Sequence, residues 1–235
     1  MKKLSKKLFL PVLIMGIVFI IFTGCKKEEE EDDNTPQNTV TDIDGNVYHF
    51  VTIGSQVWMV ENLKTTKYRD GTAIPNVTDN AAWINLGTGA YCNYSNTAAQ
   101  SDTYGRLYNW YAITDSRNLA PEGWHIPSSA EWQTLVDYLG GTGVAGGKLK
   151  ETGTTHWLSP NTGASDTHGF AAFPGGLRNS FDGAFQEMTV YGLWWCSTSF
   201  DSSKAWYWEM GFDYSDIHKL NFLKKYGCSV RCIKN

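Results

Sequence analysis

The chain has 235 residues, with 20 Lys and Arg against 24 Asp and Glu and a formal net charge of −4. This balance excludes the broad basic surface that nucleic-acid binding requires. Aromatic residues make up 14% of the chain and glycine occurs 23 times, so we expect short strands, many turns and packed rings rather than long helices.

The N-terminal segment has the layout of a secretory signal. Residues 1–7 carry four lysines and residues 8–22 carry no charge. A membrane-spanning helix needs about 20 apolar residues, so this stretch is short for a span and fits a signal-peptide core. The Thr-Gly-Cys tripeptide that ends at Cys25 resembles a bacterial lipoprotein signal, with a lipid on the Cys25 sulfur, although Phe22 replaces the usual leucine. The alternative is an uncleaved N-terminal anchor, and either interpretation places the protein on a membrane outside the cytoplasm.

An acidic tether is expected after Cys25. Two lysines and six consecutive acidic residues follow it, and nothing between residues 25 and 39 is apolar enough to be buried. Such a run after a lipidated cysteine resembles the surface-export signal of Bacteroidetes lipoproteins, which implies the outer face of the outer membrane; a periplasm-facing spacer is the alternative. We therefore divide the chain into a signal peptide at 1–24, a tether at 25–39 and a single domain at 40–235.

The first part of the domain predicts two β-hairpins. Apolar and polar residues alternate on both sides of a turn at residues 44–46 and again about residues 54–55, which is typical of antiparallel strands joined by tight turns. Asp42, Asp44 and Asn46 also have the opening spacing of a calcium loop. Because no closing glutamate follows and strands flank the segment, we interpret it as a turn.

The middle of the chain predicts loops and two helices. Residues 65–102 are rich in Asn, Thr, Gly and Ala and are expected to be mostly loop. One helix should begin after Ser128, which has a glutamate three residues later as a capping box, and should end at Gly140. A second, shorter helix is predicted over 104–112. From Phe170 onward, glycines separate what we expect to be short strands.

The sequence shows no catalytic or metal-binding motif. The five histidines have no ligand spacing, and HExxH, GxSxG and glycine-rich phosphate loops are missing, so we expect no catalytic residue, no metal and no cofactor. The domain contains Cys92, Cys196, Cys228 and Cys232. An even number of cysteines in an oxidising compartment predicts two disulfides, with three pairings open. A metal pair at Cys228 and Cys232 is the weaker alternative.

Several blocks across the domain are shared with one family. The blocks are DIDGNVYHFVTIGSQVWMVENLKTTKYRDGTAIPN, GRLYNWYA, LAPEGWHIPSSAEWQTL, GGKLKETGTTHW, FPGGLRN, GLWWCST and YGCSVRC. Together they closely resemble the Fibrobacter succinogenes major paralogous domain over about residues 40–235. That family is abundant in extracellular lipoproteins of Bacteroidetes and Fibrobacteres, and the resemblance implies no particular activity.

A more distant resemblance concerns the fold. GWHIPSSAEW, FPGGLRN, WWCST and GCSVRC are similar to landmarks of the C-type-lectin-like fold as used by formylglycine-generating enzymes. This implies an α+β domain of short twisted antiparallel strands, two or three helices and long loops. The stretch at 205–225 lacks the copper-binding cysteines of those enzymes, and the calcium and sugar motifs of animal C-type lectins are absent. The fold resemblance also implies nested disulfides, Cys92 with Cys232 and Cys196 with Cys228.

The tryptophan-rich stretch at 192–208 is expected to begin as core and to continue as surface. Trp194, Trp195 and Trp206 lie at framework positions and should be buried. The strand that follows alternates two faces that are not expected to be equally buried, so some of its aromatic residues should be exposed. The candidate ligand-binding residues are Tyr207, Trp208, Asp213 and Tyr214.

These observations favour a non-catalytic ligand-binding domain on a cell-surface lipoprotein. Aromatic rings beside carboxylates and hydroxyls are typical of surfaces that stack on a sugar or anchor a protein, and the C-type-lectin-like resemblance implies ligand residues between Phe200 and Leu223. The ligand is expected to be a glycan, a cell-wall component or another protein, and the membrane is contacted through the lipid on Cys25. A structural envelope protein without a small ligand is the alternative, and an enzyme with a displaced cysteine pair is the weakest hypothesis.

Overall fold

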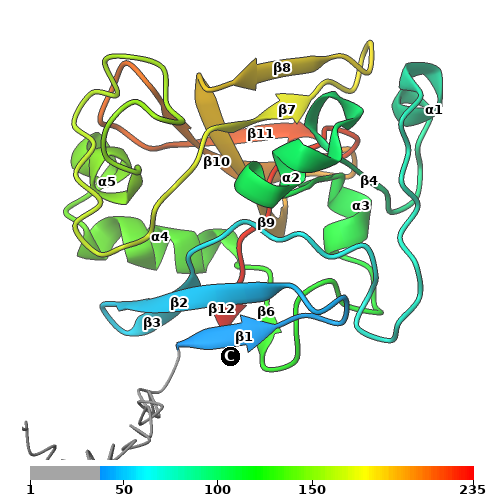
Figure 1. Ribbon diagram of the computed structural model, residues 1–235, viewed down its shortest axis with the longest axis horizontal. Helices are drawn as coiled ribbons and strands as arrows, with labels where there is room; N and C mark the ends of the chain where they lie inside the picture. Colours follow the sequence, from blue (N-terminus) through cyan, green and yellow to red (C-terminus); the bar gives the residue numbers. More distant parts are fainter. Residues whose placement is uncertain (1–37) are drawn as a thin grey trace, which may run out of the picture. The chain divides into compact units, whose positions relative to one another are not determined.

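The two ends of the domain meet in one antiparallel sheet (Figure 1). The computed structural model describes residues 38–235, so the predicted signal peptide, Cys25 and most of the tether lie outside the described residues. The C-terminal strand β12 (Ile233–Lys234) pairs with β3 (Gln56–Met59) on one side and with β6 (Trp124–His125) on the other. Adding β2 and β1 gives the order β1-β2-β3-β12-β6.

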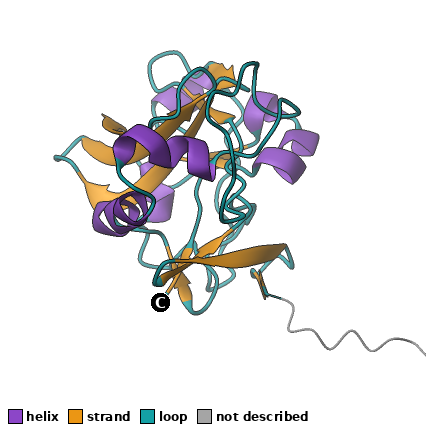
Figure 2. Ribbon diagram, turned by 90° about the vertical axis from the view of Figure 1, so that its left-hand side faces the viewer, coloured by secondary structure: helices purple, strands orange, loops and turns teal. Residues whose placement is uncertain are grey.

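The remaining strands are short and belong to three smaller sheets. A three-stranded sheet has the order β11-β10-β9, and β4-β5 and β7-β8 form two-stranded ribbons. The other elements are β1 (Thr39–Thr41), β2 (Val47–Ile53), α1 (Asn80–Ile84), β4 (Tyr91–Cys92), η1 (Tyr94–Asn96), α2 (Ala98–Tyr104), β5 (Leu107–Tyr108), α3 (Trp110–Ile113), α4 (Ser129–Tyr138), α5 (Thr142–Leu149), β7 (Gly175–Arg178), β8 (Phe185–Met188), β9 (Tyr191–Ser199), β10 (Lys204–Gly211) and β11 (His218–Leu223). Figure 2 shows that loops connect these elements over much of the domain. The mixture of helices and antiparallel sheets confirms the α+β class.

The two predicted hairpins are confirmed. The Asp42 carboxylate accepts hydrogen bonds from the backbone N–H groups of Asp44 and Asn46, both at 2.9 Å, and from the Tyr48 hydroxyl at 2.6 Å. These bonds make an Asx-type turn between β1 and β2 and commit the carboxylate to the turn. The second hairpin turns at Gly54, whose φ of +61° is a conformation that favours glycine.

The predicted helix after Ser128 is also confirmed. The Ser128 hydroxyl accepts from the Glu131 N–H, and the Glu131 carboxylate accepts from the Ser128 N–H, so the capping box is closed in both directions. Trp132, Leu135 and Val136 are buried on one face of α4. This face packs on β9 and β10.

The second predicted helix, over 104–112, is wrong. Helix α2 ends at Tyr104, and Gly105 then has a φ of +77°. The chain continues as β5 and starts a new helix, α3, after Asn109, whose side chain caps it by accepting from the Ala112 N–H. The apolar spacing that predicted one helix therefore belongs to three short elements.

Helix α5 was not predicted, because its sequence TGVAGGKL is rich in glycine. The structure explains the glycines by close backbone packing. A Cβ on Gly146 would lie 2.1 Å from the Asp216 carbonyl oxygen, and one on Gly147 would lie 2.4 Å from the Gly163 carbonyl oxygen. Both glycines let neighbouring loops lie directly on the helix, which a propensity-based prediction does not detect.

The prediction of two disulfides is wrong, because the four cysteines between residues 38 and 235 are buried free thiols. Cys92 packs with Trp83, Cys196 packs with Trp132 and Trp194, and Cys228 and Cys232 lie in a third apolar cluster. Burial raises the pKa of the Cys92 thiol to about 12 and raises the pKa of the other three as well. Each cysteine thus behaves as a small apolar core residue.

Two buried guanidinium groups bind loop backbone. Arg178 donates to the carbonyl oxygens of Val77, Thr78 and Gly183, at 2.5, 2.8 and 3.0 Å, and lies over the Trp83 ring. Arg178 has no carboxylate partner within the described part of the chain. It therefore joins β7 to the loop before α1 through backbone carbonyls.

Arg231 does the same near the C-terminus. It donates to the Asn62 side-chain oxygen at 3.1 Å and to the carbonyl oxygens of Phe170 and Ala171. The same Asn62 oxygen accepts from the Trp194 indole N–H at 2.8 Å. Burial lowers the pKa of Arg231 to about 9, which reflects the cost of removing a cation from water.

We predict that all four domain cysteines resist alkylation in the folded chain. The expected pattern is little modification at Cys92, Cys196, Cys228 and Cys232 under native conditions and full modification in denaturant without reductant, because burial both shields the sulfur and disfavours the thiolate. Peptide mass spectrometry reads each cysteine separately. Peptides linked by a disulfide in the unreduced sample would contradict the prediction.

Candidate ligand-binding surface

The structure buries two of the four predicted ligand residues. Tyr207 is 2% exposed and Trp208 is fully buried, so the prediction that they contribute to an exposed surface is wrong. The physical reason is that β10 is the central strand of its sheet, with an apolar cluster on each face. Tyr207 packs in the cluster with Trp195, and Trp208 packs in the cluster with Trp132.

The expected burial of Trp194 and Trp195 is confirmed, whereas Trp206 is only partly buried. The Lys219 ammonium lies 4.5 Å from the centroid of the Trp206 ring, and the Phe200 ring packs edge-on against it at 4.8 Å. Trp206 thus occupies the rim of the sheet, while Trp208 lies in the core.

The other two predicted residues lie at the surface, in the loop after β10. Asp213 is exposed and Tyr214 is half-buried. The Tyr214 hydroxyl donates to Glu209 Oε1 at 3.2 Å. The Tyr214 ring lies between the rings of Tyr191 and His218, at centroid distances of 6.5 and 4.9 Å.

We call the set Tyr191, Glu209, Asp213, Tyr214 and His218 the tyrosine–glutamate cluster. Strand register assembles it: Glu209 of β10 pairs with His218 of β11, and Gly211 of β10 pairs with Tyr191 of β9. A Cβ on Gly211 would lie 2.4 Å from the Tyr214 ring, so glycine at this position leaves room for the ring to fold back on the strand.

The electrostatics of the cluster favour hydrogen-bond donation by its phenol. Burial raises the pKa of Glu209, while the Tyr214 hydroxyl, His218 and the Tyr207 hydroxyl act in the opposite direction. Burial and the neighbouring Glu209 raise the pKa of Tyr214. Tyr214 consequently keeps its proton and shares it with the Glu209 carboxylate.

A buried lysine fixes the loop that carries Asp213 and Tyr214. The Lys150 ammonium donates to the carbonyl oxygens of Gly211 and Tyr214, both at 2.7 Å, and to that of Thr162 at 2.9 Å. Burial lowers the pKa of Lys150 to about 8, and the nearby Asp213 carboxylate opposes this shift. Lys150 thereby holds both ends of the Gly211–Tyr214 segment in place.

Sequence reasoning missed Tyr191, Glu209, His218 and Lys150. Glu209 lies two residues after Tyr207, so strand alternation places both on one face. The other three depend on strand pairing or on contacts between distant segments, and no local pattern indicates them.

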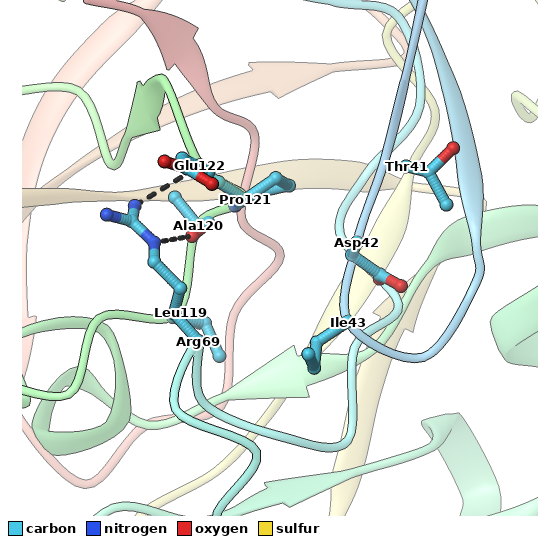
Figure 3. Close-up of a pocket in the computed structure, with 8 residues that line it drawn as sticks. All are labelled: Thr41, Asp42, Ile43, Arg69, Leu119, Ala120, Pro121 and Glu122. Carbon is cyan, nitrogen blue, oxygen red and sulfur yellow. Dashed lines mark hydrogen bonds between the residues drawn. The ribbon is translucent and has the colours of Figure 1, made fainter.

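A different hollow, of about 240 Å³, lies between the first hairpin and the loop before β6 (Figure 3). The Arg69 side chain forms part of its wall and donates to the carbonyl oxygens of Ala120, Pro121 and Trp124, each at 2.9 Å. On the other wall, Asp42 is committed to its own turn. Arg69 and Asp42 already have partners in the protein, and the third charged residue of the lining, Glu122, is a single exposed carboxylate. This hollow is therefore a weaker candidate for a ligand site.

Within residues 38–235, no group of three or more His, Cys, Asp and Glu side chains is arranged to hold a metal ion. The described helices are also too short or too polar to cross a membrane. The tyrosine–glutamate cluster itself combines rings, hydroxyls and carboxylates, which are groups suited to stacking and hydrogen bonding.

The structure defines an α+β domain with an aromatic and acidic surface cluster on its three-stranded sheet. The chain belongs to the family described as the Fibrobacter succinogenes major domain, whose model matches residues 51–234. This confirms the family resemblance seen in the sequence. No curated protein matches the chain, and no solved structure matches it.

We predict that Glu209→Gln removes part of the pH dependence of the free energy of unfolding. Because the folded-state pKa of Glu209 is raised, the folded chain binds this proton more tightly than the unfolded chain, and stability falls as pH rises through that window. The Gln variant should therefore gain stability relative to the parent as pH rises above 4.5, the ordinary pKa of a glutamate.

Urea unfolding across that pH range measures the effect. Glu122→Gln, at an exposed carboxylate outside the cluster, is the matched control. If the free energy of unfolding has the same pH dependence in the parent and in Glu209→Gln, the raised pKa of Glu209 is contradicted.

Proposed function

We propose that this domain is the non-catalytic ligand-binding part of a bacterial surface lipoprotein and that the tyrosine–glutamate cluster binds a carbohydrate. The observation that carries the proposal is the Tyr214 ring, which lies between Tyr191 and His218 with its hydroxyl on Glu209. Sugar rings present apolar C–H faces and hydroxyl edges. The half-buried Tyr214 ring can stack on a C–H face, and the neighbouring carboxylates can accept hydrogen bonds from the sugar hydroxyls.

Preorganisation supports this role. The Lys150 ammonium donates to the carbonyl oxygens of Gly211 and Tyr214, at the two ends of the loop segment. A third hydrogen bond joins the same ammonium to the Thr162 carbonyl oxygen. A loop that is ordered before binding loses little conformational entropy when the ligand arrives. The cluster therefore needs no large rearrangement to bind.

The proposed location rests on the N-terminal sequence. The lysine-rich start, the uncharged stretch before Cys25 and the acidic run after it favour a lipid anchor on Cys25 and a position on the outer face of the outer membrane. The short antiparallel strands, helices and long loops are compatible with the C-type-lectin-like fold, which we retain as a proposal.

The buried thiols weigh against an enzyme that uses a displaced cysteine pair. Thiolates are the nucleophiles and the metal ligands of cysteine chemistry. Burial raises the pKa of all four domain cysteines and so disfavours this form. The remaining alternative is a structural envelope protein without a small ligand.

A glycan array with the mature chain tests the proposal. We expect binding to at least one glycan and a loss of about tenfold or more in affinity for Tyr214→Ala, the size of effect that removing a central aromatic contact produces. Asp213→Asn should weaken binding less, because it keeps a hydrogen-bonding side chain.

Tyr138→Ala is the matched control, since Tyr138 is an exposed tyrosine on α4. Thermal unfolding of each variant separates lost binding from lost folding. Absence of any bound glycan, or equal effects of Tyr214→Ala and Tyr138→Ala, would favour the structural alternative.

A further inference from the structure

A second hollow, of about 400 Å³, lies at the opposite end of β10 from the tyrosine–glutamate cluster. Its wall is formed by segments far apart in the sequence: α3, the turn after β7, the β9–β10 loop and the end of β11. The polar residues that line it are Tyr111, Ser180, Ser202, Ser203, Lys224 and Lys225. We call it the lysine–serine pocket.

Both lysines bring positive charge that no carboxylate of the described residues pairs with. Lys224 donates to the carbonyl oxygens of Asp201 and Ser202, at 3.0 and 3.1 Å, and lies over the Trp110 ring. Lys225 donates to the Ile84 carbonyl oxygen at 2.9 Å. An ammonium group has three N–H donors, so each lysine keeps at least one for a ligand.

Ser180 closes the wall of the pocket from the inside. It is 6% exposed, and its hydroxyl oxygen is enclosed by the protein beside the Tyr226 hydroxyl. The serine hydroxyls that a ligand can reach in this pocket are those of the exposed Ser202 and Ser203.

The nearest carboxylates are turned towards their own loops. Asp201 accepts from the backbone N–H groups of Ser203 and Lys204, both at 2.7 Å, and Asp182 accepts from that of Ala184 at 3.0 Å. The Leu223 side chain adds an apolar wall. The pocket therefore combines two cations, several hydroxyls and one apolar surface.

We propose that the lysine–serine pocket binds an acidic sugar, with the carboxylate of a uronic acid against Lys224 and Lys225. Hydroxyls of the sugar meet Ser202 and Ser203, and a C–H face of the ring lies on Leu223. This site shares no residue with the tyrosine–glutamate cluster. Either proposal can therefore fail without the other.

Calorimetric titration of the mature chain with a galacturonic acid oligosaccharide tests the assignment. The methyl-esterified oligosaccharide, which has the same ring but no charge, is the matched ligand. We expect binding of the acid that weakens by about tenfold or more on esterification and in Lys225→Gln, since each removes one side of the ion pair. Ser202→Ala should weaken it as well, with little change in thermal stability.

Lys219→Gln, at an exposed lysine of β11 outside the pocket, should leave this binding unchanged. No binding of the acid, or equal binding of acid and ester, would overturn the proposal. Inorganic phosphate that binds as tightly as the oligosaccharide, with the same dependence on Lys225 and Ser202, would show a simple anion site and overturn the sugar assignment.

Discussion

Buried cations bonded to backbone carbonyl oxygens are the interaction on which this domain depends. Much of the chain is loop, and loop carbonyls lack the ladder of partners that a sheet or helix supplies. Lys150, Arg178 and Arg231 provide that partner from the interior, and each reaches the backbone of at least one distant segment. Such charge-assisted bonds are stronger than neutral ones.

This arrangement has an electrostatic cost. Removing a cation from water disfavours its charged form, and the lowered pKa values of Lys150 and Arg231 reflect that cost. Several carbonyl oxygens around each cation offset part of it. Aromatic rings offset more, because Arg178 lies over Trp83, and Arg231 lies over Phe170.

The same interaction shapes both proposed binding regions. Lys150 fixes the loop that presents Asp213 and Tyr214, and Lys224 fixes the β9–β10 loop at the lysine–serine pocket. In both places, a basic side chain orders a loop that carries polar groups to the surface. The geometry of both proposed binding regions thus depends on how the loops are held.

The elements that the sequence predicts correctly are those that depend on interactions between residues close together in the chain. The hairpins and the capped helix after Ser128 depend on residues within a few positions of one another, and both were predicted correctly. The 104–112 helix, the glycine-rich α5 and the burial of Tyr207 and Trp208 depend on segments that meet only in the folded chain. The cysteine pairing failed for the same reason, because the two members of each nested pair lie in different apolar clusters. Of the four predicted ligand residues, Asp213 and Tyr214 lie at the surface. No sequence pattern indicates that Lys150 positions them.

The most direct test of this account is amide hydrogen exchange in the Lys150→Met chain compared with the parent. If the buried ammonium orders the loops, exchange should accelerate by about tenfold or more in the segments around Thr162 and from Phe212 to Tyr214, while β9 and β10 keep their protection. Unchanged exchange in these segments would show that the loops are held by other contacts and would contradict the central role of the buried cations.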